Sequence, residues 1–215
     1  MKTVLFLVGD YWHHRETIEP LKSLLFPEEE YRVLFTEDPN TLMNMNEVPD
    51  LIVSFKDPIE NDQIPTPVWC DKLWTDRLFE YVRDQGTGLI LVHAAVTDLE
   101  GDHPIVREMI QGIFTGHPQQ CPVRFIPTKQ HEILEGISDF VLPENDEHYM
   151  MEMLKENDIE IIAQTESKNG TQPGMWVKQL GKGRVCCITP GHTTRNLTCD
   201  EYVRVMKKAS KWCCR

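Results

Sequence analysis

The sequence predicts an α/β fold with a mostly parallel central sheet, and three observations support this class. Apolar, strand-like runs alternate with helix-like patterns through the first half of the chain, as they do in successive βαβ units. Residues 89–92 are apolar at every position, which is typical of a strand covered on both faces. The chain then closes with a hairpin pattern and an amphipathic helix. We therefore expect helices on both faces of the sheet.

The first half of the chain contains four predicted strands and two predicted helices. In the second of these helices Trp74, Leu78 and Val82 recur at i, i+4 and i+8, the spacing of one helical face. Pro65 and Pro67 predict an irregular loop before it. The strands are expected at residues 4–8, 31–36, 51–55 and 89–92, and the helices at residues 17–25 and 72–84.

The second half has shorter elements. Residues 175–188 contain two strand-like runs around a Gly-Lys-Gly turn, which predicts a β-hairpin. The last helix is expected at residues 202–212, with an inner face of Val203, Met206, Ala209 and Ser210. No repeat or low-complexity linker interrupts the chain, so we expect residues 1–215 to form a single domain. The remaining elements are a short helix at 105–110 and short strands at 123–126, 148–151 and 159–164.

Composition argues against several classes of protein. The net charge of -12 opposes a nucleic-acid or anionic-membrane partner, because binding to phosphates needs clustered Lys and Arg. The apolar run at residues 4–8 is short for a secretory signal, and no run approaches the ~18 residues of a membrane helix. The seven cysteines show no Cys-x-x-Cys spacing, so neither a disulfide framework nor a thiolate zinc site is expected. We expect a cytoplasmic protein.

Histidines stand where predicted strands end, and this is the edge at which open α/β sheets bind ligands. His93 directly follows the strand at 89–92, and His192 follows the second strand of the hairpin. His13 follows the first strand, and His117 lies between two predicted elements. Strands that lie side by side in the sheet would bring such side chains into one cleft.

Glu147 adds a carboxylate to these imidazoles. A divalent metal such as zinc, held by two or three imidazoles and this carboxylate, is one interpretation of the set. Metal-free general acid–base chemistry is another, because histidine titrates near neutral pH. The residue types alone do not separate the two interpretations.

Other enzyme templates find no support in the sequence. There is no Gly-x-Ser-x-Gly or Gly-x-Cys-x-Gly, so a serine or cysteine nucleophile on a strand-to-helix elbow is not expected. There is no phosphate-binding loop, and the first βα turn lacks repeated glycines, so we expect no nucleotide cofactor. Tyr11, Trp12 and Tyr149 are aromatic residues near the histidine edge, and such rings stack on the apolar faces of sugars.

Five segments in one order and spacing resemble the ThuA-like (trehalose-utilisation) family. They are Gly-Thr-Gly-Leu-Ile-Leu-Val-His-Ala-Ala within residues 80–95, Gly-Ile-Phe-Thr-Gly-His-Pro at 112–118, His-Glu-Ile-Leu-Glu-Gly-Ile at 131–137, Asp-Glu-His-Tyr at 146–149, and Thr-Pro-Gly-His at the end of 181–192. The resemblance covers about the last two-thirds of the chain. The family commonly has Gly-Gly-Gly at 86–88 and His-Pro at 131–132, where this chain has Gly-Thr-Gly and His-Glu.

The resemblance implies a flavodoxin-like fold similar to that of class I glutamine amidotransferases. His93 stands where those enzymes place their cysteine nucleophile, so amidotransferase activity is not implied. Family members are associated with sugar metabolism, especially with disaccharides and their 3-keto derivatives, and some bind a metal. The matching positions are His93, His117, Glu147 and His192.

Together, the residues and the resemblance predict an enzyme that acts on a small carbohydrate. His93, Glu147 and His192 are the predicted catalytic residues, and His93, His117 and His192 are the predicted ligands of a possible divalent metal. The residues predicted to bind the substrate are Asp10, Tyr11, His13, His117 and Tyr149.

Two alternatives remain open. The chain is either this enzyme or a non-catalytic carbohydrate-binding or regulatory protein on the same scaffold, since fold does not dictate function. In a third interpretation the histidines only form hydrogen bonds at strand ends. Apolar residues around the hairpin suggest a homo-oligomer, with a symmetric dimer as the commonest arrangement.

Overall fold

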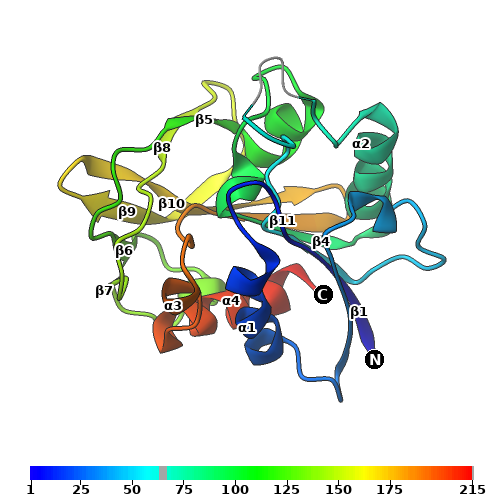
Figure 1. Ribbon diagram of the computed structural model, residues 1–215, viewed down its shortest axis with the longest axis horizontal. Helices are drawn as coiled ribbons and strands as arrows, with labels where there is room; N and C mark the ends of the chain where they lie inside the picture. The colour runs from blue at the N-terminus through cyan, green and yellow to red at the C-terminus, as the bar shows by residue number, and fades with distance from the viewer. Residues whose placement is uncertain (63–66, 215) are drawn as a thin grey trace.

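In the described residues, 1–62 and 67–214, five parallel strands form the centre of the computed structural model (Figure 1). Pro65 of the expected irregular loop lies outside the described residues. The three middle strands are largely buried, apolar runs, as the sequence predicted, whereas the edge strand at 31–36 is only partly buried. In order across the sheet they are β2 (Tyr31–Thr36), β1 (Lys2–Leu7), β3 (Leu51–Ser54), β4 (Gly88–Val92) and β11 (Gly183–Ile188).

Beyond β11 the sheet continues with strands of alternating direction. β11 pairs with its neighbour from Met175 opposite Ile188 to Leu180 opposite Gly183, which confirms the predicted hairpin. These outer strands are, in order, β10 (Gly170–Leu180), β9 (Glu160–Ser167), β6 (Arg124–Pro127) and β7 (Phe140–Val141). A separate antiparallel pair consists of β5 (Gly112–Gly116) and β8 (Met150–Met153).

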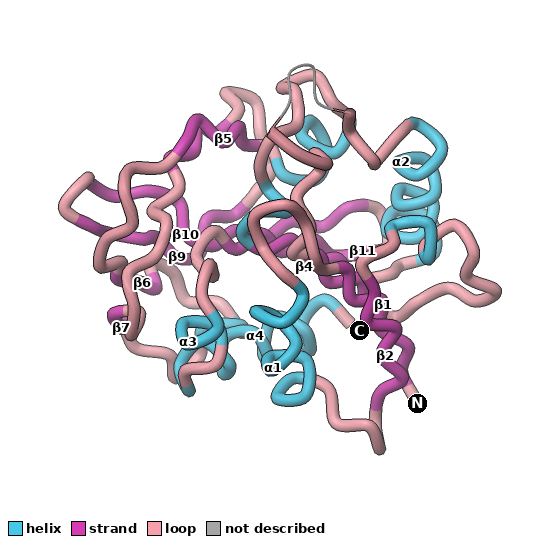
Figure 2. The backbone as a smooth tube through the Cα atoms, in the orientation of Figure 1, coloured by secondary structure: helices cyan, strands magenta, loops and turns pink. Residues whose placement is uncertain are grey.

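Helices cover both faces of the sheet, as predicted (Figures 1 and 2). The alternation of side chains along β1 explains why two cores form, since Val4 and Phe6 enter one and Leu5 and Leu7 enter the other. One face is covered by α1 (Arg15–Leu25), α3 (Thr194–Leu197) and α4 (Asp200–Cys213). The other face is covered by the helix α2 (Lys72–Phe79) and by two wider helical turns, η2 (Glu80–Gln85) and η4 (Val106–Ile110).

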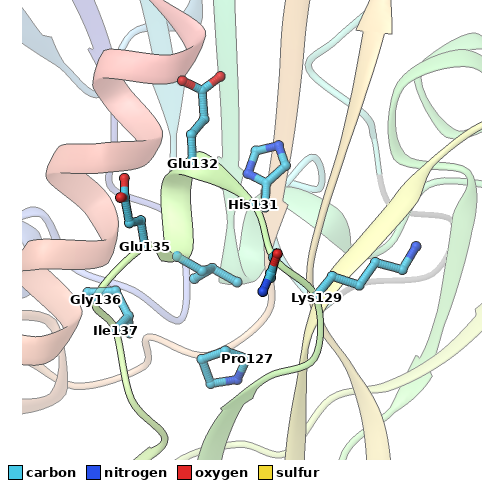
Figure 3. Close-up of a pocket in the computed structure, with 9 residues that line it drawn as sticks. Pro127, Lys129, His131, Glu132, Glu135, Gly136 and Ile137 are labelled. Carbon is cyan, nitrogen blue, oxygen red and sulfur yellow. The ribbon is translucent and has the colours of Figure 1, made fainter.

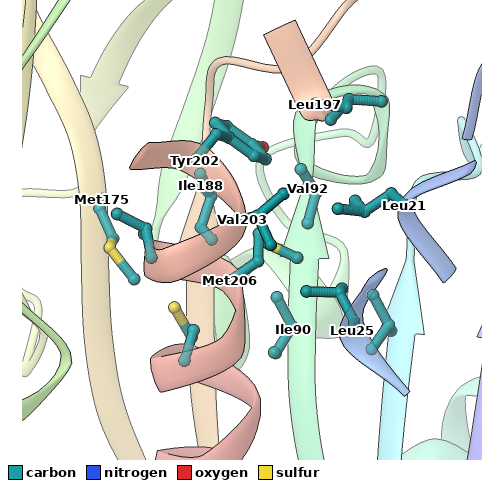
Figure 4. Packing of buried hydrophobic residues seen from close by; sticks show 14 of the residues in the cluster. Leu21, Leu25, Ile90, Val92, Met175, Ile188, Leu197, Tyr202, Val203 and Met206 are labelled. Carbon is teal, nitrogen blue, oxygen red and sulfur yellow. The ribbon is translucent and has the colours of Figure 1, made fainter. Parts of the chain in front are cut away.

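The last helix packs as its sequence pattern predicted. Val203 and Met206 of α4 lie against Ile90 and Val92 of β4, and Leu21 of α1 joins the same cluster (Figure 4). Each large apolar side chain buried in this way contributes about 1.5–3 kcal/mol to folding. The predicted inner-face residues of α4, which are Val203, Met206, Ala209 and Ser210, are all buried.

Some predicted boundaries were wrong. The strand expected at 148–151 begins two residues later, because paired backbone hydrogen bonds between Cys121 and Asp146 hold the preceding segment as a loop. Glu147, His148 and Tyr149 therefore lie before the strand. The helix expected at 72–84 is regular only to Phe79 and then widens into η2. Three short turns complete the described helical elements, η1 (Pro39–Thr41), η3 (His93–Val96) and η5 (Glu132–Leu134).

Two further findings concern the whole chain. No helix among the described residues has the length and apolar character required to cross a membrane. All seven cysteines are free thiols.

Candidate functional site

Three histidines converge where β1, β4 and β11 end. These strands are parallel, so their carboxyl ends lie at one edge of the sheet, and His13, His93 and His192 follow them. His192 Nδ1 lies 3.2 Å from His13 Nε2 and 3.3 Å from His93 Nε2. The structure thus brings His93 and His192 together, as their positions in the sequence predicted.

His93 occupies a sharp turn at the end of β4. Its backbone φ of 52° lies in the left-handed region, which is uncommon for a residue other than glycine. His93 begins the turn η3 (His93–Val96), in which Ala94 and Ala95 are buried. Turns of this kind hold the nucleophile of many hydrolases over the edge of a sheet. Here the turn holds an imidazole, although the sequence lacks the glycine pattern that usually marks it.

Hydrogen bonding assigns the proton of His93. Nδ1 lies 2.8 Å from the carbonyl oxygen of Thr189, and a carbonyl only accepts, so Nδ1 carries the proton and donates it. The other ring nitrogen, Nε2, therefore faces Glu147 and His192. Because the side chain is 1% exposed, the ring is held in this orientation.

Asp10 orients His13 in the same way. Its Oδ1 accepts hydrogen bonds from the backbone N–H groups of Trp12 and His13 and lies 3.0 Å from His13 Nδ1. Burial acts to raise the pKa of Asp10, but the hydrogen bonds and charge of His13, with the backbone bonds, lower it overall. An ionised Asp10 holds a proton on His13 Nδ1, so that Nε2 faces His192.

Asp146 holds the loops that carry Glu147 and His192. It is fully buried, and its carboxylate accepts the backbone N–H groups of Gly191 at 3.0 Å, His192 at 3.2 Å and Glu147 at 2.8 Å. It also accepts from the Asn196 side-chain amide at 3.2 Å. Asp146 was not predicted as a site residue, and its one signal in the sequence was its place beside Glu147 in the Asp-Glu-His-Tyr motif.

The Glu147 carboxylate completes the group. Its Oε2 lies 3.3 Å from His93 Nε2 and 3.3 Å from His192 Nδ1. Burial opposes ionisation of Glu147, but hydrogen bonds from His192 and His93 hold its pKa well below the usual range. The hydrogen bond to Glu147 outweighs burial at His192 and raises the pKa of that imidazole. The carboxylate is therefore ionised at neutral pH.

One potential ligand atom each from His13, His93, Glu147 and His192 lies within 4.8 Å of the others. We call these four residues the edge cluster. Imidazole nitrogens and a carboxylate oxygen are the ligand set of zinc and similar divalent ions. Metal-ligating histidines usually donate their other ring N–H to a carboxylate or carbonyl. His13 and His93 do so to Asp10 and Thr189, so the residues fit a divalent metal.

Tyr149 and His117 flank the edge cluster. The Tyr149 ring stacks on His93 with centroids 4.3 Å apart, and its hydroxyl lies 3.1 Å from His93 Nε2. Burial raises the pKa of Tyr149 well above its usual value, so the phenol keeps its proton. His117 Nε2 lies 3.7 Å from Glu147 Oε2, and its side chain is 37% exposed. The structure thus places His117 beside the edge cluster and His13 within it.

Residues 3–213 match the model of the ThuA family, which is described as trehalose utilisation. The chain belongs to the ThuA family. The match extends the resemblance seen in the last two-thirds of the sequence to nearly the whole chain. No curated protein matches the sequence.

Solved structures similar to the ThuA-family chain include two ThuA-like proteins. One from Bacteroides uniformis is 17% identical, with a TM-score of 0.77 over 99% of this chain and 90% of that one. One from Parabacteroides merdae is 15% identical, with a TM-score of 0.76 over the same shares. A β-galactosidase from Rahnella sp. R3 is 10% identical, with a TM-score of 0.63 over 98% of this chain and 31% of that one. These likenesses show a shared flavodoxin-like fold.

Tyr11, a predicted substrate-binding residue, and His148 of the Asp-Glu-His-Tyr motif both lie outside the edge cluster. Tyr11 is 54% exposed and meets Trp12 edge to face, with ring centroids 5.1 Å apart. His148 is buried, and its ring nitrogens contact the hydroxyls of Thr165 and Ser167, which explains it as a structural residue. Of the adjacent residues Glu147 and His148, only Glu147 belongs to the edge cluster.

A hollow of about 620 Å³ lies at the opposite edge of the sheet (Figure 3). β6 runs antiparallel to β4, so the loop after Pro127 lies at the amino ends of the central strands. His131 and Glu135 line this hollow, and His131 contacts Trp212 of α4 edge to face. His131 is therefore separate from the edge cluster and serves below as a control position.

Proposed function

We propose that the protein is a metal-dependent enzyme of sugar metabolism that acts on a disaccharide or keto-sugar. The observation that carries this proposal is the edge cluster, in which four metal-competent atoms lie within 4.8 Å of one another. The trehalose-utilisation description of the family supports a sugar as the substrate. His13, His93, Glu147 and His192 would hold the metal.

A divalent ion at such a site supplies Lewis-acid polarisation of a substrate oxygen or an activated water. The protein's own groups divide the remaining work. The Tyr149 hydroxyl holds its proton at a buried position next to His93 Nε2, where it can donate a hydrogen bond to a substrate oxygen. His117 is partly exposed and contacts Glu147 through Nε2, so it can exchange a proton with a bound sugar.

Metal analysis and turnover test this proposal. Protein purified without chelators should contain a stoichiometric divalent metal and convert disaccharides or their 3-keto derivatives. His93→Ala and His192→Ala should each lose most of the metal and the turnover, because each removes a ligand. His131→Ala is the matched control, since it removes an imidazole from the opposite edge of the sheet.

The outcomes distinguish the alternatives. Unchanged metal content and turnover in both edge-cluster variants would contradict the proposal. Saturable sugar binding without product after long incubation would favour a non-catalytic carbohydrate-binding or regulatory protein.

We further propose that the protein acts as a cytoplasmic homodimer, without nucleic-acid or membrane partners. The net charge of -12 supports the absence of phosphate-rich partners, and closed symmetric dimers are the commonest oligomers. Light scattering coupled to size-exclusion chromatography tests the dimer, and a monomer at micromolar concentration would contradict it.

A further inference from the structure

A second hollow, of about 370 Å³, lies at the same sheet edge as the edge cluster. Loops that follow β1, β2 and β3 supply most of its wall. Its size is near the lower end of the range of small-molecule sites, which is about 300–1,000 Å³. We call this pocket the side hollow. The lining residues that the argument uses are Asp10, Tyr11, Glu37, Lys56, Glu60 and Trp69.

Asp10 joins the side hollow to the edge cluster. The same carboxylate that lines the hollow contacts His13 Nδ1 at 3.0 Å. Only the Asp10 side chain therefore separates a molecule in the side hollow from the His13 imidazole of the edge cluster. This connection is absent from the hollow at the opposite edge, whose described lining contains no edge-cluster residue or partner of one.

Two aromatic residues give the side hollow an apolar component. Tyr11 is 54% exposed, so its ring is available to a ligand. Trp69 is held in place, because its indole N–H donates to the Asp57 carbonyl and its ring packs edge to face on Trp74. Fixed or exposed aromatic rings of this kind contact ligands at a low cost in conformational entropy.

The polar component is mainly anionic. Glu37 and Glu60 supply two exposed carboxylates, and Asp10 adds the charge of a buried one, against the single ammonium of Lys56, which donates to the Gly9 carbonyl. Gly9 has a φ of 75°, and a Cβ at this position would overlap the Glu37 carboxylate. The close approach of Glu37 to the loop after β1 thus depends on glycine.

We propose that the side hollow binds an uncharged sugar ring of the substrate and that its carboxylates exclude sugar phosphates and sugar acids. This inference rests on the proposed function, because it assumes a sugar substrate at the edge cluster. Carboxylates accept hydrogen bonds from sugar hydroxyls, and Lys56 donates one in return. A phosphate in the same place would meet like charges that are only partly screened.

Calorimetric titration of matched neutral and anionic sugars tests the inference. The neutral probes are glucose and trehalose, and the matched anionic probes are glucose 6-phosphate and trehalose 6-phosphate. The wild-type protein should bind at least one neutral probe, and its phosphorylated counterpart about tenfold more weakly or not at all. Tyr11→Ala should weaken the affinity for the neutral probe by about tenfold, because the aromatic contact is lost.

The Glu37→Gln/Glu60→Gln double variant separates charge from shape. It keeps the size of both side chains and removes two charges, so the preference for the neutral probe should fall by about fivefold or more. Glu135→Gln is the matched control, because it removes an exposed carboxylate from the opposite hollow. The control should leave the preference unchanged.

Three results would overturn the inference. They are equal affinity for neutral and phosphorylated probes, an unchanged preference in the double variant, and no binding of any neutral probe. These failures are distinct from failure of the proposed function, which is measured by metal and turnover in His93→Ala and His192→Ala. A protein that binds neutral sugars in the side hollow without converting them would keep this inference and lose the enzymatic one.

Discussion

Asp57 connects the loop that orients His13 to the turn that carries His93. Its backbone N–H donates to Asp10 Oδ2, and its own Oδ2 lies 3.0 Å from the Thr97 hydroxyl. The same Thr97 hydroxyl donates towards the Ala94 carbonyl at 2.7 Å, so its one proton is shared between Asp57 and Ala94. Burial, with the charges of Asp98 and Asp10, raises the pKa of Asp57 to about 8, which agrees with a protonated carboxyl.

The Asp57 carboxyl should make stability depend on pH. A carboxyl whose pKa is raised on folding contributes stability that is complete below its unfolded pKa of 3.8 and is lost as the pH rises through about 8. In Asp57→Asn the side chain has no carboxyl that titrates. The free energy of unfolding of this variant should therefore fall less than that of the wild type between about pH 5 and pH 9.

Urea denaturation across this range measures the effect. Asp38→Asn, which changes an exposed aspartate that caps a short turn, is the control. Parallel pH profiles for Asp57→Asn and the wild type would rule out a protonated Asp57.

Residues of the site were predictable where strand patterns located them or, for Glu147, where a motif resembled the ThuA-like family. His93 and His192 follow apolar runs, so their meeting was predicted from the sequence. His13 and His14 are adjacent, and only the hydrogen bonds of Asp10 decide which of them faces the edge cluster. Such short-range contacts depend on backbone geometry, which residue types alone do not reveal.

At the scale of elements, β4 and α4 approach each other closely at Gly88. A Cβ on Gly88 would lie 2.5 Å from the Cys213 carbonyl oxygen at the end of α4. Backbone atoms at both sides leave little room for adjustment. The start of β4 and the end of α4 can therefore pack this closely only because residue 88 has no side chain.

Gly88→Ala should destabilise the protein by about 1–3 kcal/mol, the usual range for overpacking. Gly101→Ala is the matched control, because its Cβ would meet only the flexible end of Ile113, at 3.1 Å. Thermal denaturation followed by circular dichroism compares the two variants. Equal melting temperatures for Gly88→Ala and the wild type would show that the contact is not tight.

Elements with strong apolar patterns were predicted well, and those with weak patterns were not. The second strand matches its predicted bounds of 31–36, and α4 exceeds its predicted range by two residues at one end and one at the other. β5 was not predicted, because its pairing with β8 joins segments whose own patterns are short and mixed. Long-range pairing of this kind has no local signal in the sequence.

For the whole molecule, a metal bound at the edge cluster should stabilise the folded state against unfolding. The potential ligands come from segments after β1, β4 and β11 and before β8, which an unfolded chain holds apart. Binding only to the folded state at 100 times the Kd adds about 2.7 kcal/mol to the free energy of unfolding. For a chain of this size the melting temperature should rise by about 5–10 °C.

Differential scanning calorimetry of chelator-treated protein, before and after addition of zinc or manganese, measures this rise. The His93→Ala/His192→Ala double variant should show no rise with either ion. An equal rise in the double variant and the wild type would place metal binding elsewhere.

The contact between His13 and His192 joins positions that are 179 residues apart in the sequence. During synthesis, the ribosome must add residue 192 before the edge cluster has all four side chains. Nascent chains that end between residues 147 and 191 carry His13, His93 and Glu147 but lack the imidazole that bridges them. A metal held by all four residues would thus be captured only by chains in which the hairpin strand β11 has been made and has reached the sheet.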